Sequence, residues 1–61
     1  MFELRLYREV DDKLYWKETI PSGNVDSLLV MAKLRIKSGE FTHAIIFDGN
    51  GKEQERVSKE G

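Results

Sequence analysis

The segment from Asn24 to Gly39 constrains the fold most, because it is the only part of this 61-residue chain whose pattern predicts a helix. The Asn24 side chain can accept a hydrogen bond from an unpaired N–H group at a helix start, and Gly39 can adopt the left-handed conformation that ends a helix. Asp26 lies in the first turn, and basic residues lie in the second half, as the helix dipole favours. The sequence therefore predicts one helix, with strand-like segments on both sides of it.

The predicted helix is apolar around most of its circumference. At about 100° per residue, one stripe suits a hydrophobic core and consists of Val25, Leu28, Leu29, Ala32 and Ile36. Val30 and Leu34 fall near the opposite side, with Met31 beside them. A chain of this length has little material left to cover that second side. We therefore expect Val30, Met31 and Leu34 to bind a partner, and the alternative is that they are scattered surface residues.

Two segments before the helix alternate between apolar and polar residues, as half-buried strands do. The apolar positions of residues 2–10 and 14–20 are Phe2, Leu4, Leu6, Val10, Leu14, Trp16 and Ile20. A three-residue turn at Asp11–Lys13 would pair Leu4 with Ile20, Arg8 with Trp16, and Val10 with Leu14. A two-residue turn would set Leu6 against Lys17, so the longer turn is expected.

This register has consequences for three large side chains. It buries Trp16 against the helix, where Leu28 and Ala32 are expected as its neighbours. It also leaves Arg8 and Glu18 at the rim of the inner face, where they can pair and where Arg8 can lie across the Trp16 ring.

Two more strands are predicted after the helix. Residues 41–47 form the most continuous apolar run, which is typical of a strand that is central or covered on both faces. A loop of Gly49, Asn50 and Gly51 would then form a hairpin with Asp48 opposite Lys52. Residues 52–57 are polar on both faces, as suits an exposed edge strand, and residues 58–61 are expected to be frayed.

The element order is therefore β-β-α-β-β. A right-handed crossover brings the third strand beside the first and gives the sheet order 2-1-3-4. We expect a single small α+β domain over residues 1–61, with two layers: a four-stranded antiparallel sheet and one helix packed on one face. The sheet residues expected beneath the helix are Leu4, Leu6, Trp16, Ile45 and Phe47.

The opposite, open face of the sheet is expected to mix aromatic and basic side chains. Its candidate binding residues are Arg5, Tyr7, Tyr15, Lys17 and Ile46. Such a mixture suits single-stranded nucleic acid. However, glutamates share this face and the net charge of the chain is −1, so no general electrostatic attraction to nucleic acid is expected. Nucleic-acid binding is therefore the alternative hypothesis, beside protein contact and a simply solvated face.

The sequence offers little for catalysis or metal binding. There is no Cys and only one His, so disulfides and thiolate sites are excluded and a structural zinc site is not expected. That residue, His43, has only Thr42 as a polar neighbour in its strand. The segment from Asp48 begins like a calcium loop but carries Lys52 at a ligand position and Lys59 at the closing glutamate position. We therefore expect no catalytic site, no cofactor and no metal.

Localisation follows from what the sequence lacks. No apolar run approaches the roughly 20 residues that a membrane span needs, and residues 1–10 alternate instead of forming the apolar run of a signal peptide. The absence of Cys fits the cytoplasm. The leading hypothesis is a cytoplasmic, non-enzymatic protein-interaction module, present as a homodimer or as a subunit docked on another protein.

Overall fold

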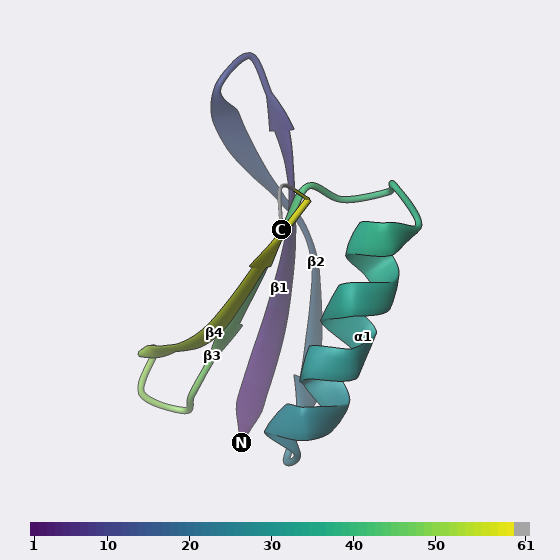
Figure 1. The fold of residues 1–61 in the computed structure, drawn as a ribbon. Coiled ribbons are helices and arrows are strands. Elements are labelled where there is room, and N and C mark those ends of the chain that lie inside the picture. The colour runs from purple at the N-terminus through teal and green to yellow at the C-terminus, as the bar shows by residue number, and fades with distance from the viewer. Residues whose placement is uncertain (60–61) are drawn as a thin grey trace.

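The computed structural model describes residues 1–59, which form a twisted sheet with one helix on one face (Figure 1). The elements are β1 (Phe2–Val10), β2 (Lys13–Ser22), α1 (Val25–Lys37), β3 (His43–Phe47) and β4 (Glu53–Ser58). The strands run antiparallel in the order β2-β1-β3-β4. The predicted α+β fold, strand order and helix position are confirmed.

The ends of α1 are set by the residues that the sequence indicated. The Asn24 side chain accepts hydrogen bonds from the backbone N–H groups of Asp26 and Ser27, at 2.9 and 3.2 Å. These bonds satisfy two of the donors that have no partner within the helix. At the other end, Gly39 has a φ of 87°, in the left-handed region that glycine adopts without strain.

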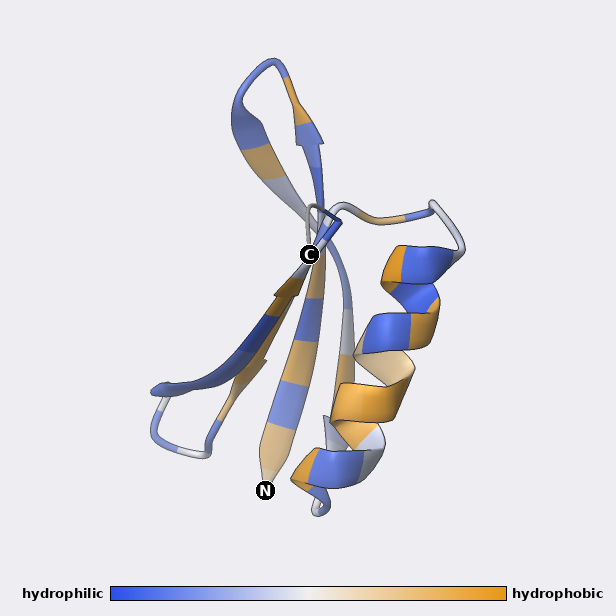
Figure 2. Cartoon of the chain, in the orientation of Figure 1, coloured by the Kyte–Doolittle hydropathy of each residue, from blue (hydrophilic) through white to orange (hydrophobic). Residues whose placement is uncertain are grey.

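The core lies between α1 and the inner face of the sheet. Its buried side chains are Leu4, Leu6, Leu28, Ala32, Ile36, Phe41, Ala44 and Ile46, and Val25 and Leu29 pack against them. The predicted core stripe of the helix is therefore confirmed. The hydropathy colouring of Figure 2 shows alternating bands along β1, as expected for a strand with one buried face, whereas β4 is hydrophilic over most of its length.

The β1–β2 hairpin departs from the predicted register. Its turn has two residues, Asp11 and Asp12, both with positive φ, a geometry whose twist matches that of the flanking strands. Leu4 is nevertheless opposite Ile20, as predicted, because the register shifts beside Lys17. This β-bulge places one extra residue in β2 and reconciles the short turn with the correct pairing further along.

The bulge moves residues 13–16 to the faces opposite to those predicted. Trp16 is opposite Tyr7 and is 55% exposed, so the prediction that it is buried against the helix is wrong. The predicted contacts of Arg8 are also wrong. Its guanidinium donates to the carbonyl oxygens of Gly39 and Glu40, and Glu18 instead binds Arg35 of α1 at 2.9 Å. Arg8 thus ties the end of β1 to the loop that follows the helix.

The faces of β3 are also the reverse of those predicted. Ile46 is opposite Leu4 and buried in the core, whereas Ile45 and Phe47 are opposite Arg5 and Glu3 on the open face. The reason is that a continuous apolar run carries no alternation from which a face could be assigned. The expectation that Ile45 and Phe47 pack beneath the helix is therefore wrong.

The β3–β4 hairpin closes as predicted. The Asp48 N–H donates to the Lys52 carbonyl at 2.9 Å, across a three-residue loop in which Gly51 has a φ of 82°. The strand β4 continues to Ser58, and the Lys59 N–H donates to the Thr42 carbonyl at 3.0 Å. Residues 58 and 59 are thus hydrogen-bonded to the sheet, while residues 60 and 61, which were also expected to be frayed, lie outside the described part of the chain.

Candidate interaction surfaces

The first candidate surface is the side of α1 turned away from the sheet, which we call the outer helix surface and define by Val30 and Leu34. These two side chains are 60% and 62% exposed. They lie one turn apart, so they form one patch. No other described element covers this side of α1 in Figure 1. The placement predicted for these two residues is confirmed.

Met31 and Arg35 form the border between this surface and the core. Met31 is half-buried and packs against the core cluster, so it contributes less exposed area than predicted. Arg35 reaches across to β2, where its guanidinium makes two hydrogen bonds to the Glu18 carboxylate, at 2.9 and 3.3 Å. This bidentate pair fixes one flank of the helix to the sheet.

The second candidate surface is the open face of the sheet, and Arg5 lies at its centre. The carbon at the centre of the Arg5 guanidinium is 4.4 Å from the centroid of the Trp16 ring and 4.4 Å from that of the Phe47 ring. These rings come from β2 and β3, on either side of β1. The Trp16 ring also lies 6.5 Å from the Tyr7 ring, tilted by 37°. The open face therefore carries three aromatic rings, and the Arg5 guanidinium lies against two of them.

This aromatic cluster is stabilised by its own chain. The indole N–H of Trp16 donates to the Thr19 hydroxyl at 2.7 Å. Ile45, at the middle of the open face, is only 6% exposed although no helix covers it. Its neighbours across the strands are Arg5 and Arg56, whose aliphatic stems can cover apolar surface while their charged ends stay in water.

Both arginines of the open face are bound to glutamates. Arg5 is hydrogen-bonded to Glu3, and Arg56 makes two hydrogen bonds to Glu53, at 3.1 and 2.9 Å. The hydrogen bonds from Arg56 lower the pKa of Glu53, because they stabilise its charged form. The positive charge on this face is therefore largely neutralised within the chain.

The structure brings only some of the predicted open-face residues together. Arg5 and Tyr7 lie on that face, whereas Lys17 is the extra residue of the bulge. Tyr15 is opposite Arg8 and lies on the helix side, and Ile46 is in the core, so both were assigned to the wrong face. Trp16 and Phe47 were missed. For Trp16, the Asp-Asp pair at the turn was the available signal, since Asp tolerates positive φ and so permits a two-residue turn, whereas the apolar run of β3 held no signal for Phe47.

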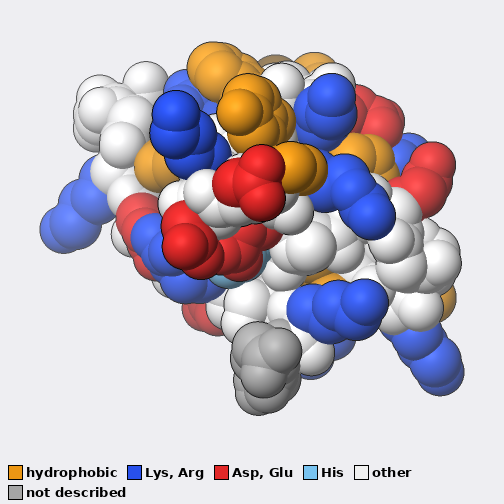
Figure 3. All heavy atoms as spheres, turned by 90° about the horizontal axis from the view of Figure 1, so that it is seen from above, with side chains coloured by type: hydrophobic (Ala, Val, Ile, Leu, Met, Phe, Trp, Pro, Cys, Tyr) orange, Lys and Arg blue, Asp and Glu red, His pale blue; other side chains and the backbone are white. Residues whose placement is uncertain are grey.

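A third apolar area is the end of the β1–β2 hairpin, which extends beyond α1 (Figure 1). Its exposed hydrophobic residues are Val10, Leu14, Tyr15 and Trp16. They alternate between the two faces of the hairpin. Figure 3, which looks onto this end of the molecule, shows hydrophobic side chains lying among acidic and basic ones. The area is therefore divided and mixed in character, unlike the single patch on α1.

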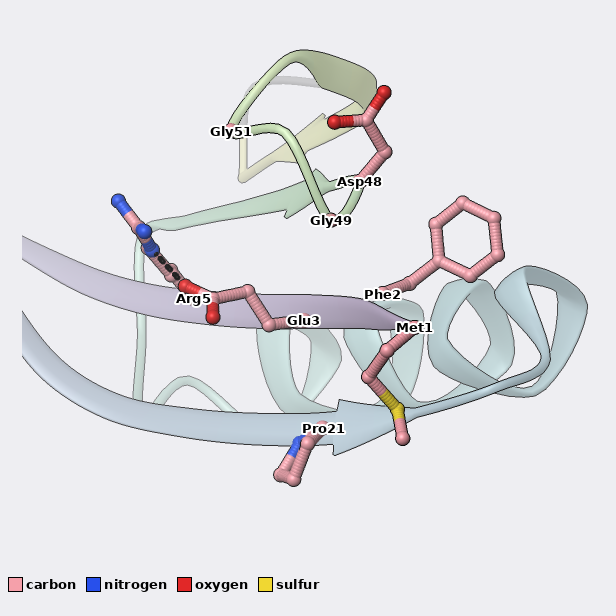
Figure 4. A pocket seen from close by; sticks show the side chains of 8 residues that line it. All are labelled: Met1, Phe2, Glu3, Arg5, Pro21, Asp48, Gly49 and Gly51. Carbon is pink, nitrogen blue, oxygen red and sulfur yellow. Dashed lines mark hydrogen bonds and ion pairs between the residues drawn. The ribbon is translucent and has the colours of Figure 1, made fainter.

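A polar hollow lies near the start of β1. Its volume is about 390 Å³, and its lining is formed by Met1, Phe2, Glu3, Arg5, Pro21, Asp48, Gly49 and Gly51. Figure 4 shows Glu3 and Arg5 joined to each other between Pro21 and the β3–β4 loop. The Asp48 carboxylate accepts hydrogen bonds from loop N–H groups, chiefly that of Lys52, and these lower its pKa. The charged groups of the hollow thus stabilise the chain itself.

The single histidine of the chain lies in β3. His43 is half-buried, and its Nδ1 lies 3.0 Å from the Thr42 hydroxyl oxygen. Within residues 1–59, no group of three or more His, Cys, Asp or Glu side chains is placed to hold a metal ion.

Comparison of the chain with protein-family models, with curated proteins and with solved structures gives no match. In the part of the chain that the structure describes, no helix combines the length and the apolar character needed to cross a lipid bilayer.

Proposed function

We propose that the chain is a non-enzymatic, cytoplasmic protein-interaction module that binds a second copy of itself or another protein through the outer helix surface. The observation that carries the proposal is the exposure of Val30 and Leu34, at 60% and 62%, on a helix whose other side supplies the core. Two adjacent aliphatic side chains on a regular helix form a preorganised contact patch, which needs little ordering when a partner binds.

The expected affinity is modest. Full burial of a Val or Leu side chain contributes about 1.5–3 kcal/mol, so burying the remaining three-fifths contributes roughly 1–2 kcal/mol for each. Four such side chains in a symmetric contact contribute about 4–7 kcal/mol, against association costs of about 4–15 kcal/mol. Flanking contacts must add to this, and a dimer is expected to dissociate in the high micromolar range or above.

The test compares two double variants by analytical sedimentation and by retention of proteins from cells of the source organism. Val30→Lys with Leu34→Glu alters the outer helix surface and should abolish self-association or the retention of a partner. Val10→Lys with Leu14→Glu is the matched control, because it makes the same kind of change at exposed aliphatic residues on the hairpin. The control should behave as the wild type does.

Two results would contradict the proposal. One is a wild-type chain that stays monomeric up to about 1 mM, a concentration chosen to reach the expected dissociation constant of the dimer, and that also retains no other protein through this surface. The other is an association that survives the helix variant and is lost in the hairpin variant. That result would assign the contact to the β1–β2 hairpin. Circular dichroism of both variants checks that the fold is intact.

A second candidate function is binding of single-stranded nucleic acid on the open face. The observation that favours it is the group of three rings, Tyr7, Trp16 and Phe47, on which bases could stack. The pairing of Arg5 with Glu3 and of Arg56 with Glu53 counts against it, because phosphate contacts need available positive charge.

Trp16 provides a direct test of this second candidate, because it is the only Trp of the chain and is exposed on the open face. Binding of a short single-stranded oligonucleotide at low salt should quench its fluorescence, and the effect should weaken as salt rises. No quenching at low salt would remove this candidate. If binding is seen, Arg5→Ala with Lys17→Ala should reduce its salt dependence, and circular dichroism checks that the variant is folded.

A further inference from the structure

Three exposed charged residues flank the same side of the outer helix surface: Asp26 near the start of α1, Lys33 near its middle and Lys37 near its end. At about 100° per residue, the Asp26 and Lys37 side chains lie only about 20° apart around the helix, on the same side of the Val30–Leu34 patch. With a rise of 1.5 Å per residue, they lie about 9 Å and 7.5 Å from the patch centre, in opposite directions along the axis.

Asp26 and Lys37 are complementary to their counterparts when two helices pack antiparallel, whereas the two copies of Lys33 lie near the same level at the margin of the contact, about 80° around each helix from the patch. A two-fold axis through the patch centre, perpendicular to both helices, brings Asp26 of each copy to the level of Lys37 of the other, on the same side of the contact. It also places Val30 of one copy against Leu34 of the other. A parallel pair would instead bring like charges to the same level and align the two helix dipoles unfavourably.

We infer that the partner of the outer helix surface is a second copy of this chain, docked with the α1 helices antiparallel and with Asp26 facing Lys37 at both ends of the contact. This inference rests on the proposed function and goes beyond it, because it assigns one occupant, its orientation and the charge pair that determines specificity. The exposed aliphatic pair provides the apolar centre of the contact, and the charge pairs set its direction.

The test uses charge reversal with complementation. Asp26→Lys and Lys37→Asp each replace two attractive contacts with two repulsive ones in a symmetric dimer. Each variant alone should therefore self-associate about tenfold more weakly than the wild type. An equimolar mixture should recover an affinity close to that of the wild type, because Lys at 26 then meets Asp at 37, and Lys37 meets Asp26, across the mixed pair. Sedimentation of the separate and mixed samples measures this.

Lys13→Asp is the control, because it reverses a charge on the hairpin, and it should leave the affinity unchanged. Both substitutions lie near helix ends, where the dipole acts on them, so each single variant loses a little stability. Recovery of affinity in the mixture cannot come from such losses, because both chains still carry them. A mixture as weak as its components would overturn the antiparallel pairing. If Val30→Lys with Leu34→Glu still dissociated the dimer, the proposed function would remain.

A monomeric wild type that retains another protein through Val30 and Leu34 would also overturn the inference while leaving the proposed function in place. A dimer that is insensitive to both the charge variants and the Val30–Leu34 variant would overturn the two together. Failure of the antiparallel self-contact can therefore be distinguished from failure of the proposed function.

Discussion

Leu28→Ala should lower the free energy of unfolding more than Trp16→Ala does, although Trp is the larger side chain. Leu28 is fully buried, and Leu→Ala at such sites costs about 2.7–5 kcal/mol. Trp16 buries only 45% of its surface, since 55% is exposed, which is roughly 110 Å² of the about 250 Å² that a large aromatic can bury. At about 25 cal/mol per Å², and after allowing for a compact unfolded state, this amounts to about 1.5–2.5 kcal/mol.

The measurement is urea unfolding followed by far-UV circular dichroism, because the Trp16→Ala chain has no indole fluorescence. A core of this size rarely supplies more than about 3–5 kcal/mol, so Leu28→Ala should be largely unfolded without denaturant. Trp16→Ala should remain mostly folded, with a lower midpoint. If Trp16→Ala lost as much stability as Leu28→Ala, or more, Trp16 would belong to the core and the bulge in β2 would be wrong.

Three further changes test individual features of the fold. Lys17 is the extra residue of the bulge, so a chain that lacks it can still pair β1 with β2 and should unfold cooperatively on heating. Loss of the cooperative transition in calorimetry would contradict the register. Gly39→Ala should cost about 1 kcal/mol in urea unfolding, because φ is +87° although nothing lies within 4 Å of the added Cβ; unchanged stability would argue against that conformation. The lowered pKa of Asp48 means that its contribution to stability is present above about pH 4 and is lost as pH falls further. The urea midpoint should therefore fall less steeply with acid in Asp48→Asn than in the wild type, and equal slopes would contradict the assigned hydrogen bonds.

The topology could be predicted from the sequence because independent signals agreed on it. The caps at Asn24 and Gly39 bounded the helix, and the alternation in residues 2–10 identified the inner face of β1. The glycine-rich loop after Asp48 fixed the second hairpin. Local preferences and the overall arrangement were consistent, and such consistency makes a fold readable from one sequence.

The residues that β2 and β3 contribute to the open face could not be predicted, because the face on which a side chain lies depends on an unbroken ladder of paired residues. One bulge at Lys17 inverts the faces of the residues between it and the turn, so Trp16 lies outside and Tyr15 inside. In β3 every residue from Ala44 to Phe47 is apolar, so pairing with β1 and packing beneath α1 decide which ones face the core. The stacking of Arg5 on the Trp16 and Phe47 rings results from the bulge in β2 and from the facing of β3. The sequence spacing of these residues does not indicate it.

The outer helix surface could be located from the sequence because the helix has no bulge to interrupt its period. Val30 and Leu34 lie opposite the core stripe at about 100° per residue, and both are exposed. Their binding role remains a prediction.

The most direct test of that role is a dilution series followed by heteronuclear NMR, from about 1 mM to a concentration well below the expected dissociation constant. We expect the amide signals of α1 to shift with concentration, most strongly between Asp26 and Lys37, while those of the β1–β2 hairpin and the open face do not. Signals that are independent of concentration throughout, or shifts confined to the hairpin or the open face, would contradict the claim that the outer helix surface binds a second copy.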